Sequence, residues 1–215
     1  GTIGLRSRVE LHLEAGCVLA GSEDLADYLP FEAEGFIGEK APEDSTICLL
    51  KASYAEHIAV TGPGEINAMG HSFFDTSTFS GRFFAKPPTP RPRHIMFFQC
   101  KDVHLERSRY IDSPCWSIWL MQCERVTVRD LVIQADQRMI NSDGLHIDAC
   151  KDVTVSGCLI RTGDDCIIAR ALQRVYATPA VCERVAVTNC VLESRCQGVR
   201  VGVTGDNIVR DCVFS

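Results

Sequence analysis

One short pattern recurs along this chain and constrains its fold more than any other feature. Each copy is a cysteine, two charged residues, a valine, one variable residue and a final Leu or Val. The four copies that align without gaps are Cys100-Lys-Asp-Val-His-Leu, Cys123-Glu-Arg-Val-Thr-Val, Cys150-Lys-Asp-Val-Thr-Val and Cys182-Glu-Arg-Val-Ala-Val. With Thr204-Gly-Asp-Asn-Ile-Val as a fifth copy, the starts are 23, 27, 32 and 22 residues apart (123−100, 150−123, 182−150, 204−182). Such variable periods are typical of a solenoid whose coils carry loops of different lengths.

Strand-like alternation within the copies predicts the type of solenoid. Val153 and Val155 alternate with polar residues, and between the copies no stretch of helical length has an amphipathic helix pattern. An all-β fold follows, a right-handed parallel β-helix (a single-stranded solenoid), because stacked coils bury one face of each strand and pair its backbone. Three copies place another cysteine eight residues after their start, at Cys158, Cys190 and Cys212.

Most of the twelve cysteines recur at matching positions, which favours inward ladders of small apolar side chains over a disulfide framework. Disulfides between some of them are the alternative. The sequence has no Cys-x-x-Cys pair, so we expect no structural zinc site.

Residues 1–215 are expected to be part of one β-helix domain that is truncated at both ends, because strand patterns open and close the chain. The segments 22–45 and 71–93 are rich in Gly, Pro and acidic residues, and we expect loops there, with 71–93 a loop insertion. The net charge of −6 without a block of like charge argues against a general nucleic-acid surface. No apolar run approaches the roughly 18 residues of a membrane span.

Candidate catalytic groups lie in two segments that the repeat places on adjacent coils. These are Asn141-Ser-Asp-Gly144 and Gly163-Asp-Asp165. Asp143 alone would be interpreted as a turn residue. Two adjacent aspartates in a strand repel one another, however, and such repulsion is how a carboxyl group keeps a proton and acts as an acid. Facing carboxylates suit glycosidic bond hydrolysis, in which one acid protonates the leaving oxygen and another activates water.

At these residues the sequence resembles the polygalacturonases, the pectin-cleaving β-helices of glycoside hydrolase family 28. Ser113-Pro-Cys-Trp116 and Gly62-Pro-Gly-Glu-Ile-Asn67 resemble two further motifs of that family. The resemblance implies that Asp164 is the general acid and that Asp143 and Asp165 hold and deprotonate the attacking water. It also implies inversion, which needs acid and base carboxylates about 6.5–9.5 Å apart. Asn141 would brace the site beside Asp143.

Two departures from the family pattern affect the expected activity. The family commonly has Gly-His-Gly on the next coil, where this chain has Cys196-Gln-Gly198. Gln197, seven residues after Cys190 as Asp165 is after Cys158, should stack one coil beyond Asp165, where it can hydrogen-bond a sugar but carries no proton. The family's later Arg-x-Lys pair would follow residue 215. Arg200, Arg170 and His146 are the remaining candidate substrate contacts.

The expected function is therefore an inverting glycoside hydrolase acting on a galacturonate-containing, pectin-like polysaccharide or oligosaccharide. A non-catalytic glycan-binding or structural β-helix is the first alternative, kept by Gln197. A polysaccharide lyase ranks lower, because no basic cluster lies beside the aspartates. We expect no cofactor, no metal and no nucleic-acid partner. The resemblance favours a secreted or periplasmic protein, and the sequence fixes neither the compartment nor the oligomeric state.

Overall fold

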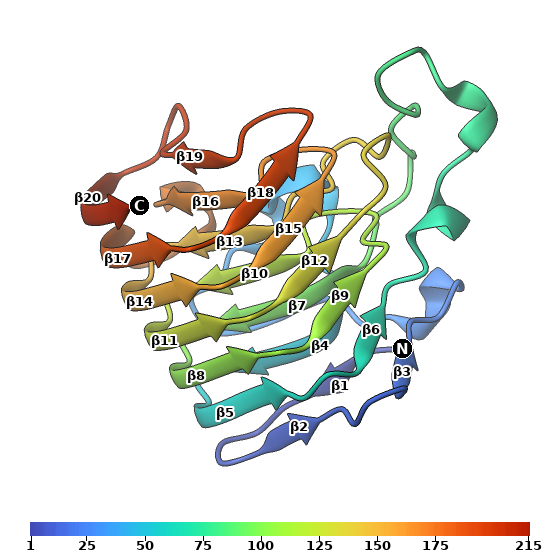
Figure 1. The fold of residues 1–215 in the computed structure, drawn as a ribbon. Helices are drawn as coiled ribbons and strands as arrows, with labels where there is room; N and C mark the ends of the chain where they lie inside the picture. The colour runs from blue at the N-terminus through green and yellow to red at the C-terminus, as the bar shows by residue number, and fades with distance from the viewer.

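The structure, a computed structural model, describes residues 1–215 and forms a right-handed parallel β-helix (Figure 1), which confirms the predicted fold. Its strands build three parallel sheets that every coil visits in turn. Sheet A contains β1 (Ile3–Gly4), β4 (Cys48–Ser53), β7 (Arg93–Phe98), β10 (Ile118–Met121), β13 (Leu145–Asp148), β16 (Ile167–Arg170) and β19 (Val199–Val201). Sheet B contains β2 (Glu10–His12), β5 (Glu56–Thr61), β8 (Lys101–Glu106), β11 (Glu124–Arg129), β14 (Lys151–Ser156), β17 (Val181–Thr188) and β20 (Ile208–Phe214).

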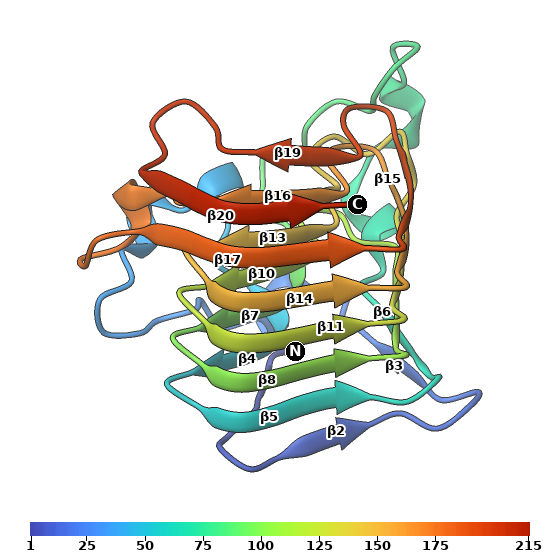
Figure 2. The same ribbon diagram turned by 60° about the vertical axis from the view of Figure 1, so that its left-hand side comes forward.

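Sheet C is the shortest of the three, and its strands lead directly into the turns that carry the candidate site. It contains β3 (Val18–Ala20), β6 (Glu65–Asn67), β9 (Arg109–Ile111), β12 (Val132–Gln134), β15 (Leu159–Thr162) and β18 (Val191–Ser194). Figure 2 shows the sheet B strands stacked in chain order from β2 to β20. The solenoid therefore brings the same position of successive coils side by side.

The repeated cysteines form the predicted inward ladder. Cys100, Cys123, Cys150 and Cys182 are fully buried at the start of the sheet B strands, the first three just before their strands and Cys182 as the second residue of β17, and the Cys123 backbone N–H lies 3.4 Å from Cys150 Sγ. All twelve cysteines are free thiols. Next to them the valines of successive copies pair in register, as Val126 does with Val153. The thiols act here as small apolar groups that let neighbouring coils approach closely.

The fifth copy of the repeat was aligned wrongly. In sheet B, Cys182 pairs with Val209 rather than with Thr204, and Cys212 takes the inward position that Val185 has one coil earlier. The turn before β20 is longer than the pattern predicts. Asp206 stabilises it by accepting hydrogen bonds from the backbone N–H groups of Ala171 and Val203.

The predicted loop segments contain short 3-10 helices: η1 (Leu25–Asp27), η2 (Gly38–Lys40), η3 (Pro42–Asp44), η4 (Gly70–Phe73) and η5 (Thr76–Thr78), with η6 (Gln173–Val175) after β16. The segment around η2 pairs with the segment around η6 through the bridge between Phe36 and Tyr176. Together they cover the outer face of sheet A, where β7, β10, β13 and β16 are buried at every position. None of the helices is long and apolar enough to cross a membrane.

Candidate active site

The predicted carboxylates lie on the turns that connect sheet C to sheet A. Asp143 precedes β13, and Asp164 and Asp165 precede β16 on the next coil. The backbone N–H of Gly144 donates to the Asp165 carbonyl at 2.9 Å, and that of Cys166 donates to the Gln197 carbonyl at 2.9 Å. Asp143, Asp165 and Gln197 therefore occupy equivalent positions on three successive coils, as the register of the cysteines predicts.

Glycine allows these turns to stack so closely. A Cβ on Gly144 would lie 2.4 Å from the Cys166 carbonyl oxygen and 2.8 Å from Ile160 Cγ2. A Cβ on Gly163 would lie 2.6 Å from the Met139 carbonyl oxygen. Any larger residue at either position would push the two coils apart.

The turns border a hollow of about 250 Å³ that brings together most of the predicted site residues. Its lining includes seven of the eight: Asn141, Asp143, His146, Asp164, Asp165, Arg170 and Arg200. Gln197 is absent from the lining. Its side chain is exposed and makes no hydrogen bond within the chain, so the amide lies outside the hollow although the backbone position is as predicted.

Asp143 is a carboxyl group that the fold holds away from water. It is 5% exposed, and its Oδ1 atom has no hydrogen-bond partner. Burial raises the pKa of Asp143 well above its ordinary value, and the negative charges of Asp164, Asp165 and Glu43 raise it further. A proton is therefore retained in this group of carboxylates at pH values where isolated aspartates are ionised.

Asp165 is also buried, at 2% exposed, but it has a cationic partner. Arg200 Nη1 lies 2.7 Å from Asp165 Oδ2. The pKa of Asp165 is raised by burial, and the hydrogen bond from Arg200 partly offsets this by stabilising the carboxylate. Arg200 thus contacts a carboxylate of the site itself.

Asp164 is the least buried of the three carboxylates. Its backbone carbonyl accepts hydrogen bonds from the hydroxyls of Thr162 at 2.6 Å and Ser194 at 2.7 Å. Its Oδ1 atom accepts a hydrogen bond from the Asp165 N–H at 3.1 Å. The backbone of this turn is therefore fixed from two coils, and the side chain keeps contact with the hollow.

His146 contacts a catalytic candidate rather than open solvent. It is 1% exposed, and its Nε2 atom lies 3.1 Å from Asp143 Oδ2. Its ring stacks on Trp116 with centroids 3.6 Å apart and 11° between the planes. Burial lowers the pKa of His146 well below its usual range, and Arg170 and Arg93 lower it further. The ring therefore favours its neutral form, and its Nε2 atom faces the Asp143 carboxyl group at hydrogen-bond distance.

The two remaining predicted contacts are held by neighbours that the sequence patterns did not indicate. Arg170 Nη2 lies 2.9 Å from Asp206 Oδ1, and the guanidinium lies 5.6 Å from the Trp116 ring. Asn141 has a left-handed backbone, with φ 58°, and its Oδ1 accepts from the buried Arg91 at 3.2 Å. Asn141 thereby braces the turn before Asp143.

Sequence reasoning missed several residues of this site. Glu43 lines the hollow from η3, and Arg91 and Arg93 are fully buried beneath it. The only sequence signal for the burial of Arg91 and Arg93 was their position next to prolines in the run 87–93. Arginine is rarely buried, and a buried guanidinium needs hydrogen-bond acceptors nearby. Asp164, Asp165 and the exposed Cys196 each place one possible metal-ligand atom within 4.8 Å of the others. This is the one cluster of His, Cys, Asp or Glu side chains at the site that could hold a cation.

Comparison with known proteins gives the family. A model of the glycosyl hydrolases family 28 matches residues 27–208. The parallel β-helix of this chain, with carboxylates stacked on its turns, is therefore the scaffold of a glycoside hydrolase family. The chain belongs to glycosyl hydrolases family 28, as the resemblance of its motifs implies.

Individual relatives are similar over part of their length. A probable polygalacturonase of Arabidopsis thaliana is 32% identical over 112 residues, which span 52% of this chain and 22% of that protein. A polygalacturonase of Malus domestica is 30% identical over 130 residues, or 59% of this chain and 28% of that protein. The chain thus matches only about a quarter of either relative.

Among solved structures, a hyperthermoactive exopolygalacturonase from Thermotoga maritima has a TM-score of 0.75 at 21% identity, covering 99% of this chain and 55% of that one. A polygalacturonase from Erwinia carotovora has a TM-score of 0.70 at 17% identity, covering 94% of this chain and 57% of that one. At these identities the two structures support the fold.

Proposed function

We propose that this chain carries the active site of an inverting glycoside hydrolase that cleaves a galacturonate-containing, pectin-like polysaccharide or oligosaccharide. The observation that supports the proposal most is the convergence of Asp143, Asp164 and Asp165 on one hollow, from two turns of a family 28 scaffold. Hydrolysis with inversion needs a protonated carboxyl group and an ionised one in the same cleft, and these three groups supply both.

The charges of the hollow favour one shared proton among the carboxyl groups. The raised pKa of Asp143 and of Asp165 comes first from burial, and the charge of Asp164 raises both. Because the groups interact, their proton belongs to the cluster rather than to one residue. Asp164, the most accessible of the three, would deliver a proton to the glycosidic oxygen, while Asp143 and Asp165 hold a water molecule and accept its proton.

His146 contacts one of the three carboxyl groups, Asp143, and would stabilise it. Its Nε2–H stabilises the ionised form of Asp143, and stacking on Trp116 fixes the orientation of the ring. Because His146 is neutral, it does not compete with Asp164 as a proton donor. We assign it a positioning role rather than the substrate contact that the sequence suggested.

A uronate is the sugar that the basic groups favour. Arg170 and Arg174 line the hollow, and guanidinium groups bind carboxylates through paired hydrogen bonds. Arg200, which pairs with Asp165, adds a third cation to the lining. The names of the similar proteins, polygalacturonase and exopolygalacturonase, point to the same polymer.

Gln197 favours a second candidate function, glycan binding without turnover. A glutamine cannot hold or transfer a proton, and this one extends outside the hollow. If the acid at Asp164 needed a charged neighbour there, the site would bind sugars and leave them intact.

The Asp164→Asn variant tests the proposal against this alternative. Polygalacturonate is incubated with the protein and new reducing ends are counted. We expect the wild type to release them and Asp164→Asn to lose at least about a thousandfold in rate while keeping its melting temperature. Asp152→Asn, which changes an exposed aspartate on the outside of sheet B, is the matched control. Turnover by Asp164→Asn at the wild-type rate would contradict the assignment, and a wild type that binds without turnover would establish the second function.

A further inference from the structure

A second hollow lies outside the active site, at the ends of the sheet C strands and beside the loop that contains η4. Its volume is about 570 Å³, within the range of roughly 300–1,000 Å³ that small-molecule sites occupy. It is lined by His71, Ile111, Asp112, Gln134, Ala135, Asp136, Gln137, Arg138, Arg161 and Arg195. None of these residues lines the active-site hollow.

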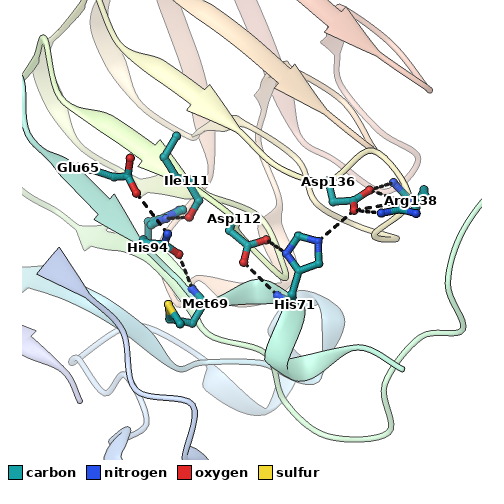
Figure 3. Close-up of polar contacts among 9 residues, drawn as sticks. Glu65, Met69, His71, His94, Ile111, Asp112, Asp136 and Arg138 are labelled. Carbon is teal, nitrogen blue, oxygen red and sulfur yellow. Dashed lines mark hydrogen bonds and ion pairs between the residues drawn. The ribbon is translucent and has the colours of Figure 1, made fainter. Parts of the chain in front are cut away.

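The acidic groups of this second hollow are already neutralised. His71 lies between two carboxylates (Figure 3), with Nδ1 2.7 Å from Asp112 Oδ1 and Nε2 3.1 Å from Asp136 Oδ2. Arg138 adds a contact of 2.6 Å between Nη2 and Asp136 Oδ2. Burial lowers the pKa of His71, but the contacts of the ring with both carboxylates outweigh burial and raise the pKa above its ordinary value. His71 and Arg138 thus already contact both carboxylates at one end of the hollow.

Two further arginines are left without strong partners at the other end. Arg195 has no carboxylate within ion-pair distance, and its Nη1 donates to the Arg82 backbone carbonyl at 2.6 Å. Arg161 Nε lies 3.2 Å from Glu193 Oε1, and both side chains are about half exposed. A surface ion pair of this kind contributes little to the free energy of folding. In a chain with net charge −6, this hollow therefore presents guanidinium groups that can accept an anion.

The turns of the solenoid connect the two hollows. Arg161 lies three residues before Asp164 on one coil, and Arg195 lies two residues before Gln197 on the next. In sheet C, Arg161 pairs with Glu193, so the two arginines come from adjacent coils. A single extended anionic polymer that crosses these turns would pass from Arg161 and Arg195 to the carboxylates of the active site.

We propose that this second hollow is an accessory binding site for a uronic acid residue, whose carboxylate is held by Arg161 and Arg195. Arginine suits this ligand because its planar group binds a carboxylate through two parallel hydrogen bonds. The choice of a uronate, rather than another anion, rests on the proposed function. The site holds polymeric substrate beside the active site and leaves the cleavage chemistry unchanged.

The test uses the full chain with Asp164→Asn, which prevents turnover during a titration. Trigalacturonate is added while NMR follows the backbone amides of 134–138 and the side-chain Nε–H signals of Arg161 and Arg195. We expect both sets of signals to shift, and Arg195→Gln or Arg161→Gln to weaken the fitted affinity at these signals about tenfold or more. Arg125→Gln, on the outside of sheet B, is the matched control and should leave the affinity unchanged.

Two further ligands identify the chemistry. Neutral galactotriose and sodium sulfate are titrated in the same way, and neither should match trigalacturonate. Sulfate binding as tightly as trigalacturonate would overturn the uronate assignment, and shifts confined to Asp165 and Arg200 would overturn the site. Wild-type hydrolysis of polygalacturonate is measured separately. Its absence, with Arg161 and Arg195 still responding, would refute the proposed hydrolase and leave the accessory site standing.

Discussion

The ion pair between Arg200 and Asp165 should set the acid side of the pH–rate profile. Arg200 Nη1 donates to Asp165 Oδ2 at 2.7 Å, and the carboxyl group is 2% exposed. A charge-assisted hydrogen bond contributes about 1.5–3 kcal/mol. The Arg200 side chain is 39% exposed, so screening by water reduces this to about 1–2 kcal/mol. Since 1.36 kcal/mol corresponds to one pKa unit, Arg200→Gln should raise the pKa of Asp165 by about one unit.

The sign of the effect follows from the role of Asp165. Its ionised form accepts a proton from water, so activity falls as the pH drops through its pKa. In Arg200→Gln the acid limb of kcat/KM should therefore move about one unit toward higher pH. Arg200→Lys keeps a charge and should move the limb less. The assay is the release of reducing ends from polygalacturonate between pH 3 and about 8.

A substrate contact by Arg200 would give a different result. Loss of a contact to the uronate carboxylate lowers kcat/KM by the same factor at every pH and leaves the limb where it was. A limb that stays in place, or moves toward lower pH, would refute the argument that Arg200 stabilises ionised Asp165.

Three other predictions concern the scaffold. Gly144→Ala should lower the free energy of unfolding in a urea titration by about 2 kcal/mol or more, because the added Cβ meets the Cys166 carbonyl oxygen at 2.4 Å. Gly4→Ala, whose added Cβ has nothing within 4 Å, is the control and should change this free energy little. Burial lowers the pKa of His94 to about 4, so below its unfolded value of about 6.5 the unfolded state binds a proton that the folded state excludes. Stability should then fall by up to about 3 kcal/mol between pH 6.5 and 4, and an equally steep fall in His94→Gln would contradict this cause. In native protein a thiol reagent should label the exposed Cys17 and Cys196 first, and all twelve thiols should react after denaturation without reductant, whereas fewer would indicate disulfides.

The sequence predicted those parts of the fold that repeat. The cysteine pattern gave the coils, the inward ladder and the register that stacks Asp143, Asp165 and Gln197, because a solenoid places equal positions of successive coils together. The register failed at the fifth copy, where Thr204 was aligned in place of Val209. The aliphatic residues after Thr204 resemble those of the other copies closely enough to fit the wrong register. No local sequence pattern predicted the longer turn that the hydrogen bonds of Asp206 stabilise.

The cysteine repeat could not predict which segments cover sheet A. The segments around Phe36 and Tyr176 are 140 residues apart (176−36) and pair through irregular backbone, to which no periodicity applies. Glu43 lines the hollow from η3, and His146 is buried against Trp116. Accordingly the sequence indicated His146 as a substrate contact, whereas in the structure its ring stacks on Trp116 and its Nε2 atom lies 3.1 Å from Asp143 Oδ2.

The three aspartates are proposed to perform hydrolysis with inversion. NMR of the anomeric protons during early turnover of polygalacturonate by the protein tests this assignment, since it records the configuration of each new reducing end before mutarotation. The product should first appear as the anomer opposite to the linkage cleaved, and Asp164→Asn should release none. First release of the retained anomer, or of an unsaturated uronate, would contradict the assignment of Asp143, Asp164 and Asp165 to an inverting site.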